Sequence, residues 1–113
     1  MPWGIIKQTA IGRFCDRVVN NMESKDQIIE RLKVAGYITV HEYDDAAGEY
    51  FADHTHPGEE HLIVIRGSLE VNMDGKHYVC NTGDELNFPQ MMVHDARIGQ
   101  EGCFYIVGEK EPV

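Results

Sequence analysis

Between Tyr37 and Val107 the chain is a succession of short β-strand-like segments separated by turns, and this pattern limits the possible folds more than any other feature. The segments are rich in β-branched and aromatic residues, and they comprise residues 37–43, 49–56, 60–66, 68–73, 76–80, 94–98 and 103–107, with a shorter one around Leu86 and Phe88. Asp74-Gly75 is the strongest hairpin signal. Strands at such regular spacing predict an all-β sandwich or barrel, and periodicity alone leaves both open.

One short helix is expected before the strands. Ser24 and Gln27 form a capping box, and Gly36 supplies a stop, so the pattern predicts a helix over residues 25–35. A strand is also possible around Phe14 to Val19. We therefore divide the chain into an N-terminal strand and helix segment (1–36), packing on the barrel, and the barrel itself (37–113), as one structural domain overall.

The segment 60–66 is apolar on both faces. If Leu62 and Val64 point inward with Glu60, then Ile63 and Ile65 point outward. A strand with one face in water should alternate apolar with polar residues. The outward face must then be covered by the helix, the facing sheet or another subunit, and we predict a homodimer formed partly through Ile63 and Ile65.

Composition narrows the partners. The chain has 113 residues and a net charge of −9, which argues against nucleic acid and anionic membranes because both attract basic faces. The N-terminus lacks the features of a signal peptide, and no apolar run reaches membrane-spanning length. The three cysteines include no C-x-x-C spacing, as expected of reduced thiols. These features predict a cytoplasmic protein.

A candidate metal site lies at the first corner of the barrel. His54 and His56 are one residue apart, so in an extended chain both side chains point to the same face. A turn at Pro57-Gly58 can return the chain so that Glu60 faces the same point. Two imidazoles and a carboxylate suit a divalent transition metal ion. The plainer alternative is a set of ordinary core or surface histidines beside an exposed glutamate.

Two stretches resemble the motifs of the cupin superfamily. The stretch from Gly48 to Gly67 fits the first motif at every fixed position, with His54, His56 and Glu60 at the ligand positions. A second stretch matches its motif at three positions and departs from it at two. The matches are Gly83, Pro89 and His94; the departures are Met91, where the family has glycine, and Ile98, where it has asparagine.

The resemblance implies a jelly-roll β-barrel and a metal held by His54, His56, Glu60 and His94. We expect one divalent transition ion per chain (Fe, Mn, Zn or Ni) and no organic cofactor. Four protein ligands leave two positions open in an octahedral shell. We also expect the loop from Pro89 to His94 to use ordinary backbone angles, with Met91 or Met92 narrowing the entrance.

The expected function is that of a small metalloenzyme, dioxygenase-like (an oxidoreductase) or isomerase-like, acting on a small molecule in the barrel. The alternative is a non-catalytic, metal-dependent module for binding or sensing a small molecule. A partly apolar ligand is favoured by the inward residues Leu62, Val64, Leu69, Val71, Leu86 and Phe88, while Tyr50, Phe51 and Phe88 are candidates for lining the pocket. The sequence assigns no catalytic residue.

Overall fold

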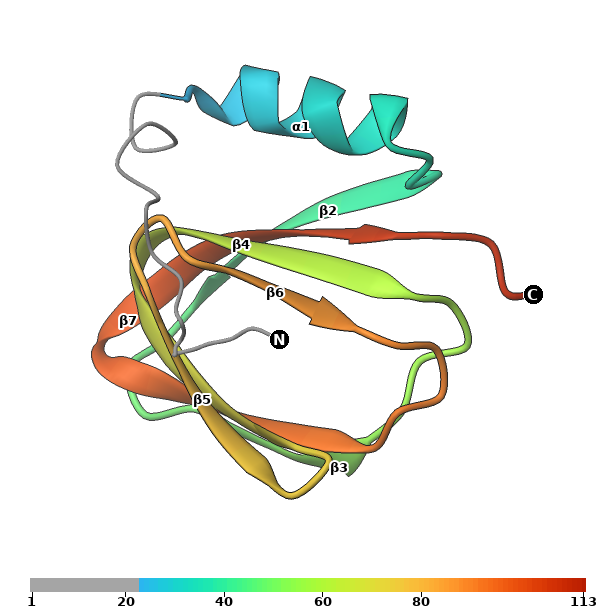
Figure 1. Cartoon of the computed structure of the whole chain (residues 1–113). Helices are drawn as coiled ribbons and strands as arrows, with labels where there is room; N and C mark the ends of the chain where they lie inside the picture. The colour runs from blue at the N-terminus through green and yellow to red at the C-terminus, as the bar shows by residue number, and fades with distance from the viewer. Residues whose placement is uncertain (1–22) are drawn as a thin grey trace.

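The computed structural model describes residues 23–113, in which one helix is followed by six strands that close into a barrel (Figure 1). The elements are α1 (Lys25–Val34), β2 (Thr39–Asp45), β3 (Tyr50–His54), β4 (Glu60–Met73), β5 (Lys76–Asn81), β6 (Glu85–Phe88) and β7 (His94–Glu109). The helix and all strand regions match the predicted pattern in kind. The strand expected around Phe14 to Val19 lies outside the described residues. Within 23–113, no helix is long and apolar enough to cross a membrane.

The two longest strands, β4 and β7, join the two halves of the barrel. The antiparallel sheet runs in the order β2-β7-β4-β5, with β3 paired to β7 and β6 paired to β4. Each of the two strands was expected as two separate strands, and this was wrong. Pairing between them continues through register shifts on either side of Gly67, so each chain segment bends without ending as a strand. Gly67 has φ +86°, which is a conformation that favours glycine.

The interior of the barrel is filled by alternating side chains from both halves. The buried cluster consists of Leu62, Val64, Leu69, Val71, Met73, Cys80, Leu86, Phe88, Ile98 and Cys103. The inward residues expected from the sequence all belong to this set. The jelly-roll prediction is confirmed by this arrangement of a bent antiparallel sheet around one core.

Helix α1 covers the outer face of β4. The capping box at Ser24 and Gln27 is present, and Ala35 caps the C-terminal end. Ile28 and Leu32 pack with Ile63, Ile106 and Tyr37 into a second buried cluster, and Ile63 is only 3% exposed. The helix lies outside the barrel beside β2 and β7 (Figure 1). The prediction that Ile63 contacts a second subunit was therefore wrong, because this chain's own helix buries it. The homodimer itself stays a prediction.

A polar cluster holds α1 against β6. The carboxylate of Glu85 accepts hydrogen bonds from Arg31 Nη2 at 3.0 Å and from His61 Nε2 at 2.8 Å. Burial opposes ionisation of Glu85, but the bonds and charges of His61 and Arg31 prevail and lower its pKa to about 2. His61 thus points away from the barrel interior and takes part in packing the helix.

We predict that Ile63→Ala lowers the free energy of unfolding by about 2–5 kcal/mol, because it leaves a cavity beneath α1. The matched control is Ile38→Ala, since Ile38 is 57% exposed; its effect should stay within about 0.5 kcal/mol. Urea titration measures both variants, and sedimentation of Ile63→Ala should match the wild type. A change in oligomeric state with little change in stability would show that Ile63 is a subunit contact after all.

The lowered pKa of Glu85 predicts a loss of stability in acid. A carboxyl group whose folded pKa is about 2, against 4.5 as its ordinary value, stabilises the fold above pH 4.5 and loses that contribution as the pH falls towards 2. The full contribution is on the order of 3 kcal/mol. Urea unfolding between pH 7 and pH 2 measures it. Glu85→Gln should flatten this part of the profile, whereas Glu70→Gln, at an exposed ion pair with His77, should not. A wild-type slope retained in Glu85→Gln would assign the acid sensitivity to other groups.

Candidate metal centre

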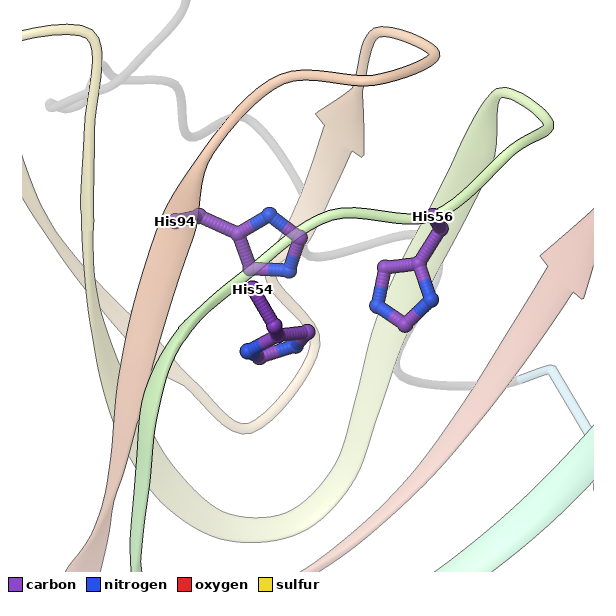
Figure 2. Close-up of side chains that lie close together, drawn as sticks. All are labelled: His54, His56 and His94. Carbon is purple, nitrogen blue, oxygen red and sulfur yellow. The ribbon is translucent and has the colours of Figure 1, made fainter.

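Three histidine side chains converge at one end of the barrel. His54 is the last residue of β3 and His94 the first of β7, and the two are paired across the strands. His56 lies in the loop just beyond β3. Strand β3 is thus shorter than the segment 49–56 that was expected from the sequence. One ring nitrogen from each of the three lies within 4.8 Å of the others. Figure 2 shows the three rings facing a common space.

Backbone carbonyls fix the orientation of two of these rings. His54 Nδ1 lies 2.6 Å from the oxygen of Ala52, and His94 Nδ1 lies 3.0 Å from the oxygen of Met92. A carbonyl oxygen can only accept, so each Nδ1 carries the proton and donates it. The other nitrogen, Nε2, then keeps its lone pair. This is the usual arrangement of a histidine that binds a metal ion.

The local environment also favours the uncharged form of two of the imidazoles. Burial lowers the pKa of His56 and of His94, and the proximity of His54 lowers both further. Unprotonated imidazole is the form that binds metal ions. Phe88 packs against the His94 ring at a centroid distance of 4.5 Å and shields it from water. The donor set and its protonation therefore fit a divalent transition ion.

Glu60 lies beside the histidine cluster without belonging to it. Its Oε2 atom is 3.4 Å from His56 Nδ1. Glu60 does not belong, however, to the group of side chains whose ligand atoms all lie within 4.8 Å of one another. The pKa of Glu60 is raised to about 7. Burial is the main cause, and the charge of Glu109 and a hydrogen bond with Glu109 raise it further. The structure thus brings together three of the four predicted ligands and places the fourth at the edge of the same cavity. The inclusion of Glu60 stays a prediction.

The histidines and Glu60 form one end of a cavity of about 140 Å³ inside the barrel. Its other lining residues are Tyr43, Phe51, Leu62, Leu69, Val71, Phe88, Ala96, Ile98, Tyr105 and Val107. Phe51 and Phe88 were correctly expected here. Tyr50 is not part of the lining: it is 49% exposed, and its hydroxyl donates to Asp95.

Sequence reasoning missed the lining residues of β2 and β7. Tyr105 and Val107 lie two residues apart on β7, and Tyr43 is paired with Tyr105 across the strands. The two-residue spacing was a usable signal, since such residues share a face. Without the pairing of β2 to β7, however, the sequence does not tell which face of either strand points inward.

The loop before His94 differs from its prediction. Met91 has φ +61°, so the residue that replaces the motif's glycine still adopts a conformation suited to glycine. Its N–H donates to the oxygen of His56 at 2.8 Å, and this bond holds the backbone in place. Met91 is 58% exposed, and Met92 packs against the core. Neither residue lines the cavity, so the expected narrowing of the entrance was wrong.

Comparison with known proteins agrees with this geometry. A family model described as "Cupin domain" matches residues 41–107. The structure of the DMSP lyase DddQ from Ruegeria pomeroyi is similar, with a TM-score of 0.60 and 25% identity over 64% of this chain. That match spans only 37% of the lyase, so this chain corresponds to little more than a third of it.

Two further structures share the fold. A Rhizobium leguminosarum protein of unknown function matches with a TM-score of 0.61 and 23% identity, over 66% of this chain and 70% of that one. KdgF from a Halomonas species matches with a TM-score of 0.54 and 18% identity, over 64% and 68% of the two chains. No curated protein matches the sequence significantly.

We predict that Met91→Gly leaves metal content and ligand binding unchanged, because the side chain is exposed and outside the cavity. Glycine relieves the strain of the left-handed conformation (about 1–2 kcal/mol), which stabilises the fold. Glycine also has more freedom in the unfolded chain, which destabilises the fold, so the free energy of unfolding should change by less than about 1 kcal/mol. Met91→Val is the contrasting variant. A β-branched residue is poorly tolerated at positive φ, and its melting temperature should fall clearly. Altered ligand affinity in Met91→Gly would return this residue to the cavity entrance.

Proposed function

We propose that this chain, which belongs to the cupin family, binds one divalent transition metal ion and uses it to act on a small molecule in the barrel. The observation that carries the proposal is the cluster of three imidazoles within 4.8 Å. In His54 and His94, Nδ1 donates its proton to a backbone carbonyl, so Nε2 is the nitrogen left to bind an ion. A cluster of ordinary core histidines would not require this shared orientation.

The residues that would hold the ion are His54, His56 and His94, with Glu60 as the fourth ligand. Glu60 already lies next to His56 and on the lining of the same cavity. When bound, such an ion supplies Lewis acidity and open coordination positions for a small ligand. Three or four protein ligands leave at least two positions of an octahedral shell free.

The cavity favours a small, compact ligand. Its volume of about 140 Å³ is below the roughly 300–1,000 Å³ of pockets for drug-sized molecules. Apolar side chains form most of its walls, so a ligand can form hydrogen bonds with the protein at only a few positions. Where these walls exclude water, electrostatic interactions with a ligand would be stronger.

The remaining lining residues favour chemistry that depends on the ion. Once the histidines and Glu60 are assigned as ligands, Tyr43 and Tyr105 are the other lining side chains that exchange protons. Burial raises the pKa of both tyrosines, so both are protonated at neutral pH and neither can act as a base. We therefore favour an oxygenase-type or isomerase-type metalloenzyme. The likeness to the DMSP lyase adds lyase chemistry to the reactions worth testing.

We predict that the double variant His54→Ala with His56→Ala loses metal while keeping the barrel. Elemental analysis of the wild type should give about one equivalent of transition metal per chain, and the double variant should give almost none. Circular dichroism checks that the variant is folded. His77→Ala, at an exposed histidine on β5, is the control and should retain the metal. Wild-type metal content in the double variant would contradict the proposed site.

Glu60→Gln tests the fourth ligand separately. If Glu60 binds the ion, this change should weaken metal affinity by 10-fold or more, measured by competition with a chelator. Unchanged affinity would leave a site of three histidines. Turnover that is lost when the metal is removed, without loss of the fold, would distinguish an enzyme from a module with a structural ion.

A further inference from the structure

The cavity has a second polar group, on the sheet wall formed by β2 and β7. The hydroxyl of Tyr105 donates a hydrogen bond to Asp45 Oδ2 at 2.6 Å, and the Tyr105 ring stacks on Tyr43 at a centroid distance of 5.3 Å. Both tyrosines line the cavity. The proposed metal site does not use any of these residues.

This group lies at a different position along β7 from the proposed metal site. Glu60 is paired with Glu109 at one end of β7, while Tyr105 lies further along the strand, towards the bend at Gly67. The histidines, Glu60 and Tyr105 all line the same cavity of about 140 Å³. One small ligand in this cavity can therefore lie between the proposed ion and Tyr105.

The bond to Asp45 decides what Tyr105 can offer to a ligand. A phenol has one proton, and here the carboxylate of Asp45 takes it in a short, charge-assisted bond. Burial raises the pKa of Tyr105, and the bond to Asp45 raises it further, so the proton stays on the phenol. Only the lone pairs of the oxygen remain for a ligand, and lone pairs accept hydrogen bonds.

The charge around this group agrees with that constraint. No lysine or arginine is among the described residues that line the cavity. Asp44 and Asp45 lie at the end of β2, next to Cys103 and Phe104 of β7. Asp45 shares the face of Tyr105, whereas Asp44 points to the opposite face of β2. An anionic group beside Tyr105 would meet the charge of Asp45 and no lysine or arginine, whereas an ammonium or hydroxyl group would find an acceptor.

A purely structural role explains the bond less well. Strands β2 and β7 already pair at every position from Thr39 to Asp45, so the Tyr105–Asp45 bond is not needed to join them. The bond instead fixes the direction of a hydroxyl group in the wall of the cavity.

We propose that Tyr105, oriented by Asp45, selects a ligand whose inner end is a hydrogen-bond donor, either a protonated amine or a hydroxyl group. This inference rests on the proposed role of the cavity as a ligand site. It defines the substrate class as a small molecule with a donor group at one end, joined by a short apolar segment to the part that faces the ion. Tyr105 is a specificity residue, and Asp45 is a positioning residue.

The test uses three probes with a four-carbon chain: butylammonium, 1-butanol and butanoate. The full-length chain is titrated with each probe by NMR, once without metal and once with Zn²⁺. Without metal, butylammonium and butanol should shift the amide signals of Tyr105 and Val107, and butanoate should bind at least about tenfold more weakly. Comparable binding of butanoate in the metal-free protein would overturn the inference.

Three variants assign the preference to its source. The double change Tyr105→Phe with Asp45→Asn keeps the ring, removes the acceptor and leaves no unpaired carboxylate, so the preference for butylammonium over butanoate should shrink to about twofold or less. Asp45→Asn can donate its own N–H to the phenol oxygen and free the phenol proton, which should improve butanoate relative to butylammonium. Tyr43→Phe is the matched control and should keep the wild-type preference. A wild-type preference in the double variant would refute the assignment.

Two readouts keep this test apart from the proposed metal site. Melting temperature reports a general structural effect, which would weaken all three probes together and leave their ratio unchanged. Metal content is measured separately. A chain that binds no metal but shows the predicted preference would refute the metal proposal and support the inference; metal binding without the preference would do the reverse.

Discussion

Residues 62–65 of strand β4 are apolar on both faces, and the burial of both faces governs the rest of the described structure. Leu62 and Val64 on its inner face fill the barrel, while Ile63 on its outer face is covered by α1. Each fully buried aliphatic side chain stabilises the fold by about 1.5–3 kcal/mol relative to an exposed one. Removal of the helix from one face or of the barrel core from the other would expose apolar area, so we expect the helix and the barrel to unfold together.

The polar groups lie where this apolar core ends. His54 and His94 are at the ends of neighbouring strands, and Glu60 begins β4, so the core positions these side chains at one opening of the barrel. The rings of His54 and His94 are then oriented by carbonyls two residues away. The interior therefore supplies a rigid support, and local backbone bonds supply the fine geometry, as a preorganised site needs.

Much of this arrangement could be predicted from local patterns. The capping box identified α1, and two-residue alternation identified the inner residues of β4. The joining of 60–66 with 68–73 was not predictable, because the bend at Gly67 depends on pairing with β7. The same holds for Tyr105, whose inward direction depends on its partner strand. Met91 at positive φ was missed because its amide donates a hydrogen bond to another loop, and this bond maintains the conformation. Long-range pairing determined each of these features.

The bond from the Met91 amide to the His56 carbonyl has a dynamic consequence. His56 lies outside any strand, so its backbone lacks the support that a sheet gives to His54 and His94. This bond ties its loop to the segment that leads into His94. The two loops should therefore open together, as one local unfolding unit, and the exchange of the Met91 amide proton with solvent would report that opening. A bound ion would slow this exchange, because it would join both loops from the inside.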